Sequence, residues 1–351
     1  MKVANLLKKA VELGASDLHL RAGMVPKVRI NGKLHDLEHE DIDTDNDCKF
    51  IYDILSEDKR KAFDERFEVD FAYDMPDLCR VRVNFLKFKD GLGAVFRIIP
   101  FVIKPFADLR LSKNILEFAK IEQGLVLVTG PTGSGKSTTL AAVIDYINNT
   151  RNCHILAIED PLEFVHKNNK GMVTHREIGT HTHSFASALR AGLREDPDII
   201  LVGELRDMET IQMAITAAET GHLVFSTLHT SCASSTIDRL VNVFPVGQQN
   251  QTRVMLSQLL RGVVSQQLLL LQNGKGRVCA TEIMFCNSAI ANLIREGKTH
   301  QIFSAIQTGR REGMQTMDQS IIGLVKNELV SFDEGVKHAF DKELFNRFQR
   351  A

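Results

Sequence analysis

The sequence GPTGSGKS, residues 130–137, lies between the apolar run LVLVT at 125–129 and the sequence STTLAAVIDYI, which begins at Ser137. A short apolar run bounded by a turn predicts a buried strand, and the sequence after the loop has the apolar spacing of a helix. A glycine-rich loop between a strand and a helix is the arrangement of a phosphate-binding loop, and the residues match its pattern GxxxxGK[ST]. This stretch therefore predicts a nucleoside triphosphate site.

Each residue type in this loop has a chemical reason. Glycines let the backbone curl so that successive N–H groups point at phosphate oxygens. The lysine brings a positive charge to the β- and γ-phosphates, the serine hydroxyl reaches Mg²⁺, and the positive end of the following helix adds to the attraction. We expect ATP to contact Gly130, Thr132, Gly133, Ser134, Gly135, Lys136, Ser137 and Thr138.

Strands and helices alternate in the region that the loop opens. Apolar runs predict further strands at 154–158, 199–202 and 222–227, and helices at 136–148, 184–194, 208–219 and 231–241. This alternation predicts a doubly wound α/β sheet, whose ligands bind at the carboxyl ends of its strands. Beyond about residue 245 we predict a hairpin at 264–285 and helices at 251–264, 287–295, 300–307, 317–329 and 332–345.

The first hundred residues predict a separate α+β domain. Residues 3–13 have the pattern of an amphipathic helix, and two alternating stretches predict strands joined by a hairpin turn at Asn31-Gly32. Residues 41–47 are a polar loop, because they lack the glycine that a calcium-binding loop needs.

Prolines at 100 and 105 interrupt regular structure and predict a linker. The expected domains are therefore 1–100 and 113–351, joined by the linker 101–112, with a helical C-terminal part from about 287.

The sequence CRVRVNFLKFKDGLGAVFRIIP, which starts at Cys79, predicts a hairpin with many charges. If its two-residue turn is Asp90-Gly91, Arg97 faces Asn84. Arg80 and Arg82 lie on the same face, because alternate residues of a strand share one side of a sheet. Three arginines on one stiff ribbon could bind an anion or simply form a solvated face.

The composition is typical of a soluble protein of two or three domains, with 351 residues, 44% of them hydrophobic and 25% charged. A formal net charge of -1 disfavours nucleic acid as a direct partner, since proteins that bind it usually carry a basic excess. No apolar run approaches about 18 residues and no signal peptide is evident, so we expect a cytoplasmic protein without direct membrane insertion. None of the six cysteines forms a CxxC pair, which disfavours a zinc site.

Acidic side chains follow two of the predicted strands at the edge that carries the loop. Glu159 and Glu163 come after the second strand, and Glu204 comes after the third. Hydrolysis of a phosphate needs a metal ion, a polarised water and positive charge on the transferring group, and carboxylates supply the first two. We expect Ser137, Glu204 and Glu159 to hold Mg²⁺, directly or through water, and Glu163 and Glu204 to polarise the attacking water. A lone carboxylate at a strand end is also typical of a helix cap, so the prediction depends on both clusters.

For Glu204 and for His229, the sequence leaves a question about the role of the residue. Glu204 stands where a Walker B strand delivers its carboxylate, although Gly203 occupies the usual aspartate position. His229 follows the fourth strand, and either a role in sensing the nucleotide or a structural role fits it.

Several long motifs occur in the order typical of one family. The chain resembles the type IV pilus retraction ATPases, the PilT family of twitching motility, within the secretion-ATPase superfamily. The matching motifs are ASDLHL at 15–20, GPTGSGKSTT at 130–139, IEDPLEFVH at 158–166, LREDPDIILVGELRD at 193–207 and TGHLVFSTLHT at 220–230. In this family a glycine precedes the Walker B glutamate, as Gly203 does here.

The resemblance implies a Mg-dependent ATPase that assembles into a homohexameric ring. It implies a PAS-like N-terminal domain, which packs on the neighbouring subunit, and a RecA-like ATPase domain with a helical C-terminal part. Arg80, Arg82 and Arg97 would reach the phosphates as the domains close. The ring would turn the platform protein at the pilus base, and so act in the cytoplasm, peripherally at the inner membrane, to retract pili.

Two features favour retraction over pilus assembly. Assembly ATPases of the superfamily usually carry an additional N-terminal domain and a four-cysteine zinc module, and this sequence shows neither. AIANLIRE at 289–296 is similar to the AIRNLIRE motif of the retraction family, with Ala291 in place of the arginine. SQQLL at 265–269 is similar to the accessory paralogue of the retraction motor. A weakly hydrolysing accessory subunit that acts with a paralogous retraction ATPase therefore remains an alternative, as does a motor for a related secretion or DNA-uptake pilus.

Overall fold

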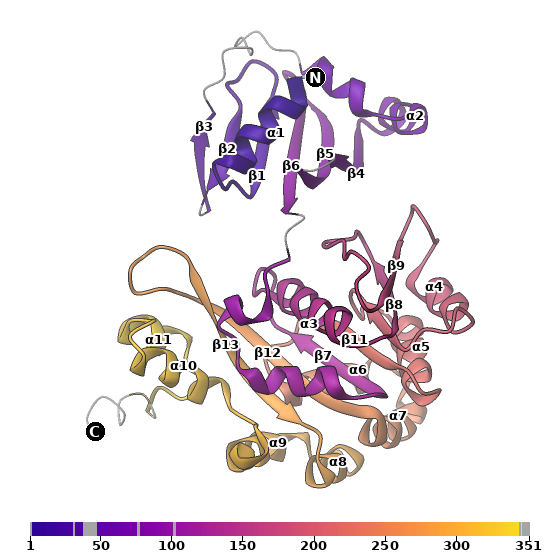
Figure 1. Ribbon diagram of the computed structural model, residues 1–351, viewed down its shortest axis with the longest axis vertical. Coiled ribbons are helices and arrows are strands. Elements are labelled where there is room, and N and C mark those ends of the chain that lie inside the picture. Colours follow the sequence, from indigo (N-terminus) through magenta and orange to yellow (C-terminus); the bar gives the residue numbers. More distant parts are fainter. Residues whose placement is uncertain are drawn as a thin grey trace. The chain divides into compact units, whose positions relative to one another are not determined.

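The computed structural model describes residues 2–30, 32–37, 48–75, 78–100, 103–343 and 345. The chain forms two compact units, Met1–Val102 and Ile103–Ala351, each with its own sheet (Figure 1). The polar loop predicted at 41–47 lies outside the described residues, as does Asn31 of the predicted hairpin turn.

The first unit is built on an antiparallel sheet with the strand order β3-β2-β1-β6-β5-β4. Its strands are β1 (Asp17–Arg21), β2 (Lys27–Ile30), β3 (Lys33–Asp36), β4 (Glu68–Met75), β5 (Cys79–Phe88) and β6 (Gly91–Pro100). Its helical elements are α1 (Lys2–Glu12), η1 (Lys49–Ile54) and α2 (Glu57–Arg66). Alternation along β5 buries Val81, Val83 and Phe85 in one core with Leu6 of α1 and Phe63 of α2, and gives the other face of the sheet its charged side chains.

The register of the β5–β6 hairpin differs from the prediction. Arg97 pairs with Arg82 and not with Asn84, so the turn is Lys89-Asp90 rather than Asp90-Gly91. Side chains alternate with a period of two, and a shift of two residues keeps each of them on its predicted face. The three arginines therefore still share one face.

Gly91 explains this shift, because it serves as the first residue of β6 instead of as a turn residue. Its φ is +148°, and a Cβ at this position would lie 2.7 Å from the Cβ of Ala22. The glycine thus permits a close approach between neighbouring backbones, which the dipeptide Asp-Gly does not reveal by itself.

The second unit is the predicted doubly wound α/β domain, with the strand order β13-β12-β7-β11-β10-β8-β9. Neighbouring strands from β12 to β9 are parallel, and β13 is antiparallel to β12. The strands are β7 (Gly124–Thr129), β8 (His154–Glu159), β9 (Met172–Glu177), β10 (Ile199–Val202), β11 (Leu223–Leu228), β12 (Leu260–Leu270) and β13 (Arg277–Phe285).

The first helices of this unit lie among the strands in sequence, and the last ones form the predicted helical C-terminal part (Figure 1). The α-helices are α3 (Lys136–Thr150), α4 (Phe185–Gly192), α5 (Met208–Glu219), α6 (Ala233–Asn242), α7 (Val246–Leu259), α8 (Ser288–Arg295), α9 (Ile302–Thr308), α10 (Met317–Lys326) and α11 (Phe332–His338). Short 3₁₀ helices are η2 (Phe106–Leu109), η3 (Lys113–Lys120), η4 (Thr299–Gln301) and η5 (Gly309–Glu312). Among the described residues, every helix is too short or too polar to cross a bilayer.

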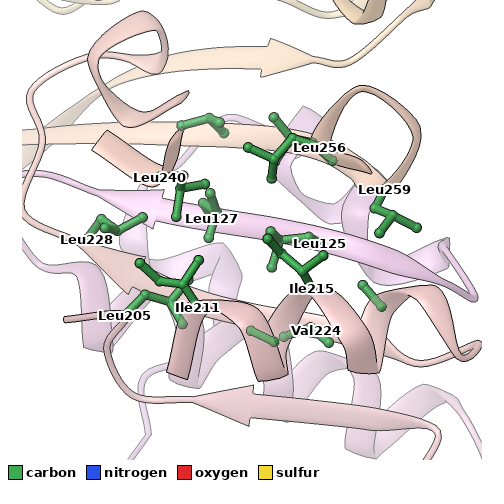
Figure 2. Close-up of a cluster of buried hydrophobic side chains, with 14 of the residues drawn as sticks. Leu125, Leu127, Leu205, Ile211, Ile215, Val224, Leu228, Leu240, Leu256 and Leu259 are labelled. Carbon is green, nitrogen blue, oxygen red and sulfur yellow. The ribbon is translucent and has the colours of Figure 1, made fainter. Parts of the chain in front are cut away.

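Strand β7, which leads into the glycine loop, is buried on both faces. Leu125 and Leu127 belong to the core shared with α5, α6 and α7 (Figure 2). Val126 and Val128 belong to the core on the opposite face, with residues of α3 and η3. Because β7 is paired on both sides, with β11 and β12, the loop leaves the sheet from an interior position at its carboxyl edge.

One predicted boundary in the second unit needs correction, and one strand was not predicted. Only part of the helix predicted at 251–264 is helical, because α7 ends at Leu259 and the chain continues directly as β12. Leu259 and Leu260, on the two sides of this junction, are both apolar and suit a helix end and a strand equally well, and β12 is fixed by its pairing with β7 and β13. Strand β9 was not predicted, because its sequence MVTHRE ends in four polar or charged residues and it forms the edge of the sheet.

Part of the predicted linker is also folded. Residues from Ile103 onward belong to the second unit. Phe106, in η2, is buried in the same core as Val143 and Ile147 of α3. Pro105 therefore directly precedes a segment that packs on the second unit, so the predicted linker is folded from Phe106 onward.

Candidate functional site

The loop between β7 and α3 has a backbone that requires glycine. Gly130 has a φ of +145°, and a Cβ there would lie 2.5 Å from the carbonyl oxygen of Gln266 and 2.6 Å from Oγ of Ser134. Gly133 and Gly135 also have positive φ angles. The loop thereby turns toward the start of α3, where the first N–H groups of a helix have no partner within the helix. The hydroxyl of Ser134 is buried and has no hydrogen-bond partner within the described part of the chain.

Two hydrogen bonds from residues of β12 fix the start of the loop and helix α3. Thr129 Oγ1 donates a hydrogen bond to Ser265 Oγ (2.9 Å), and Gln266 Nε2 donates one to Thr139 Oγ1 (2.7 Å). Both bonds are buried. The SQQLL sequence at 265–269 therefore supports the phosphate loop, which gives it a structural reason within this chain.

Lys136 is folded back onto the loop. Its Nζ donates to two carbonyl oxygens of the loop at 2.9 Å and 3.1 Å, and lies 3.5 Å from Nδ1 of His229. The residue is only 8% exposed. Burial lowers the pKa of its ammonium group, while the charges of Glu204 and Glu163 act in the opposite direction. The lysine is therefore a partly desolvated cation, which strengthens its attraction for an anion.

Glu204 lies between two basic side chains. Its Oε1 is 3.3 Å from Nε2 of His229, and its Oε2 is 2.9 Å from Nε of Arg206. Since the other ring nitrogen of His229 faces Lys136, carboxylate, imidazole and ammonium form one continuous chain. These residues meet because β10, β11 and β7 are neighbouring parallel strands with a common carboxyl edge. The sequence placed Glu204 and His229 at this edge, but Arg206 carried no prediction.

Two further carboxylates follow β8, and their environments differ. Glu159 is buried at the end of the strand, and its Oε2 accepts a hydrogen bond from the backbone N–H of Glu163 (3.3 Å). Glu163 itself is exposed, yet close enough to Lys136 for its charge to raise the pKa of the lysine. The structure thus brings both predicted carboxylates to the loop, one inside and one on the surface.

A small cavity lies beside the start of α3. It is lined by Ser137, Leu140, Ala141, Glu159, Phe164, His166, Leu201, Gly203 and Thr227. The hydroxyl of Ser137 and the carboxylate of Glu159 are hard oxygen ligands of the kind that Mg²⁺ takes. Within the described ranges, no group of three or more His, Cys, Asp or Glu side chains lies together. Glu204, the third predicted ligand, is not part of the lining.

His166, the last residue of the motif at 158–166, was not predicted as a site residue. It is buried against the cavity, and its Nδ1 has no hydrogen-bond partner among the residues that the structure describes. Its ring stacks on that of His175 with centroids 5.9 Å apart. Burial lowers the pKa of His166 to about 4, with a smaller contribution from His175, so the ring is neutral at neutral pH. Only its position at the end of a motif could have drawn attention to it.

The predicted arginines lie on the charged face of the sheet of the first unit. Arg82 and Arg97 are directly opposite each other on β5 and β6. Arg80, on the same face, is mostly buried, with its Nη1 3.4 Å from Asp74 Oδ1. Arg97 Nε lies 3.2 Å from Oδ1 of Asp17. The structure thus brings the three arginines onto one surface, together with an acidic residue that was not predicted.

Comparison with known proteins agrees with these observations. The family model "Type II/IV secretion system protein" matches residues 1–337. The type IV pilus retraction ATPase PilT of Pseudomonas aeruginosa is 50% identical over 350 residues, which is 98% of this chain and 100% of that protein. A crystal structure of the pilus retraction motor PilT with bound ADP has a TM-score of 0.90 and 46% identity, and the match covers 99% of each chain.

A second Pseudomonas aeruginosa protein, the type IV pilus ATPase PilU, is 35% identical over 97% of this chain and 89% of its own length. The identity to PilT is clearly higher, and the structural match extends over both units. The resemblance inferred from the motifs and the predicted fold class are therefore confirmed. The chain belongs to the type II/IV secretion system protein family and, within it, to the PilT-type pilus retraction ATPases.

Proposed function

We propose that this ATPase is the motor that powers type IV pilus retraction, and thereby twitching motility, by hydrolysing ATP. The observation that carries the proposal is the chain of side chains from Lys136 through His229 to Glu204, at the mouth of a phosphate loop. The match to a PilT motor over the whole length supports the choice of retraction as the work that is done.

ATP binding exchanges the partners of Lys136. The phosphates replace the loop carbonyls that its Nζ now contacts, and backbone N–H groups of the loop and of α3 hold further phosphate oxygens. Ser137 and Glu159, with Glu204 through water, hold Mg²⁺, which neutralises charge on the phosphates. Because Lys136 is already partly desolvated, its ammonium group can bind the phosphates with little rearrangement of the loop.

Hydrolysis then depends on how water and charge are placed. Glu204 and Glu163 orient and polarise the attacking water at the open edge of the loop. His229 bridges Glu204 and Lys136, so it can transmit the state of the phosphates to the carboxylate. The first unit supplies the arginines Arg80, Arg82 and Arg97. They stabilise the charge that develops on the transferring phosphoryl group, in the manner of an arginine finger.

We further propose that the working form is a homohexameric ring. Each turnover moves the first unit as a rigid body, and the ring turns the platform protein at the base of the pilus. The motor thus acts from the cytoplasm, peripherally at the inner membrane, without contact to nucleic acid. The accessory role is the alternative, and the higher identity to PilT than to PilU supports the principal motor.

The proposal is tested by replacing Lys136 with alanine, both in purified protein and in cells. We expect Lys136→Ala to lose ATP hydrolysis, because the cation that holds the phosphates is removed. Lys120→Ala is the matched control, since this exposed lysine of the same unit pairs with Glu117 on the surface. A strain that carries Lys136→Ala should accumulate surface pili and lose twitching, while Lys120→Ala behaves as the wild type.

Other outcomes identify the alternatives. Normal hydrolysis by Lys136→Ala would overturn the assignment of the site. A strain without pili would indicate an assembly motor. Hydrolysis at the background level by the wild-type protein, with full retraction only when a paralogous ATPase is present, would indicate the accessory subunit. A Lys136→Ala strain that loses DNA uptake alone would indicate an uptake motor.

A further inference from the structure

Four charged residues form a row across the sheet of the first unit. Arg29 on β2 is paired with Asp17 on β1, Asp17 with Arg97 on β6, and Arg97 with Arg82 on β5. Directly paired residues of antiparallel strands point to the same face, so all four side chains emerge on one side. The row contains three cations and a single carboxylate, so Asp17 is the one residue of the row that offsets the positive charge of the arginines.

Asp17 is buried in spite of its charge. It is only 7% exposed, and its carboxylate accepts hydrogen bonds from Ser16 Oγ (2.8 Å) and from Arg97 Nε (3.2 Å). Oδ2 of Asp17, which accepts the bond from Ser16, is also 3.9 Å from Nε of Arg29. A carboxylate is kept in such a place only when cations and hydrogen-bond donors compensate for the water that it has lost. Asp17 is therefore fixed, and it provides a rigid anchor for the arginines on either side.

The contact with Asp17 leaves the two Nη nitrogens of Arg97 available for a ligand. The carboxylate takes the Nε–H, whereas the Nη nitrogens of Arg97 have no partner among the described residues. The side chain of Arg97 is 70% exposed. A guanidinium group that is held at Nε can still present its Nη pair, and such a pair matches two oxygens of a phosphate.

Asp17 also offsets the repulsion between Arg97 and Arg82. Like charges that are directly opposite in antiparallel strands destabilise the pair. Within the described residues the side chain of Arg82 has no hydrogen bond or ion pair. Without the carboxylate, the two guanidinium groups would separate, and Arg97 would lose its fixed direction.

We propose that Asp17 is a positioning residue for Arg97, which it holds by Nε so that both Nη nitrogens stay available to bind the phosphates of ATP. This inference rests on the proposed role of Arg97 in stabilising phosphate charge. Asp17 itself touches no reacting atom. It acts by keeping the arginine in one conformation before the transition state forms, which lowers the cost of reorganisation.

The test is a double-mutant cycle between Asp17 and Arg97. Asp17→Asn keeps the shape of the side chain and removes its charge, and we expect kcat to fall about tenfold with a smaller change in KM for ATP. In an Arg97→Ala background the same substitution should have no further effect on kcat, because the arginine that it positions is gone. Asp17→Glu, which keeps the negative charge but displaces the carboxylate, is a second variant with the same expectation.

Asp36→Asn is the matched control. Asp36 on β3 forms an ion pair with Lys27 on the same sheet, away from the three arginines of the proposed site. We expect its kcat to remain that of the wild type. The thermal unfolding midpoint of each variant is measured in parallel, because a purely structural role of Asp17 would lower the midpoint and reduce kcat equally in both backgrounds.

Such an equal reduction would overturn the positioning role. So would full activity of Asp17→Asn and Asp17→Glu beside an impaired Arg97→Ala, and in both cases the proposed motor would stand. Normal turnover by Arg97→Ala would instead overturn the role of Arg97, and the positioning role with it. ATP hydrolysis at the loop is decided separately by Lys136→Ala.

Discussion

The imidazole of His166 is buried beside the cavity at α3, and this burial links the stability of the second unit to pH. The pKa of the ring is about 4 in the folded protein, against an ordinary value of 6.5. Between these two values the unfolded chain binds a proton that the folded chain does not. The free energy of unfolding therefore falls as the pH is lowered from about 6.5 to about 4, by roughly 3 kcal/mol in total.

Replacing His166 with asparagine should remove this contribution. We expect the free energy of unfolding of His166→Asn, measured by urea denaturation at a series of pH values, to fall less steeply between pH 6.5 and pH 4 than that of the wild type. His183→Asn is the control, because His183 is an exposed histidine of the same unit. Parallel curves for His166→Asn and the wild type would contradict the link.

The residues of the site that sequence could predict are those whose chemistry lies in a local motif. Lys136 and Glu204 each follow a recognisable strand, so parallel pairing alone brings them together. Asp17 was missed because its partner Arg97 is 80 positions away, and the sequence around neither residue indicates that the two are in contact. Gln266 supports α3 across 127 positions and was missed for the same reason.

Strand β12 depends on a glycine where its pairing with β7 shifts register. A Cβ at Gly262 would lie 2.2 Å and 2.3 Å from ring atoms of Phe118 and 2.6 Å from the carbonyl oxygen of Met284. Phe118 is fully buried and stacked on Phe285, so it cannot move aside. We expect Gly262→Ala to lower the free energy of unfolding by about 1–3 kcal/mol, as overpacked cores do.

Gly323→Ala is the matched control for this change, and chemical denaturation of both variants is the measurement. Gly323 lies in the middle of α10, and a Cβ there would meet no atom within 4 Å. Alanine is the better helix former, so this variant should gain about 0.5–1 kcal/mol. Similar stability changes in the two variants would show that the backbone at β12 adapts and that the close packing on Phe118 is not rigid.

Elements were predictable where one pattern dominated. The strand at β7 is buried on both faces, so its sequence is a continuous apolar run. The junction at Leu259 could not be located, because Leu259 and Leu260 suit a helix and a strand equally well and only pairing with β7 and β13 decides between the two structures. The hairpin of the arginines was shifted by two residues, since the close approach at Gly91 is a tertiary effect.

At the scale of the whole molecule, each unit carries a complete core and one part of the proposed machinery. The arginines lie on the first unit, and the phosphate loop lies on the second. A ring offers a way to combine them, because head-to-tail contacts that close into a ring give every subunit the same neighbour. In the proposed ring, the first unit of one subunit serves the loop of the next.

This arrangement can be tested by mixing two variants, Lys136→Ala without activity and Arg97→Ala with strongly reduced activity. Lys136→Ala keeps Arg97 but loses its own loop, and Arg97→Ala keeps the loop but loses the arginine. If the arginine acts across subunits, an equal mixture that is allowed to exchange subunits should recover about a quarter of the wild-type ATP hydrolysis, because half of the loops are intact and half of their neighbours supply Arg97. Each variant measured alone at the same total concentration is the control. If the mixture stays at the level of the separate variants after exchange has been verified, the arginine acts within its own chain and the proposed sharing between neighbours is wrong.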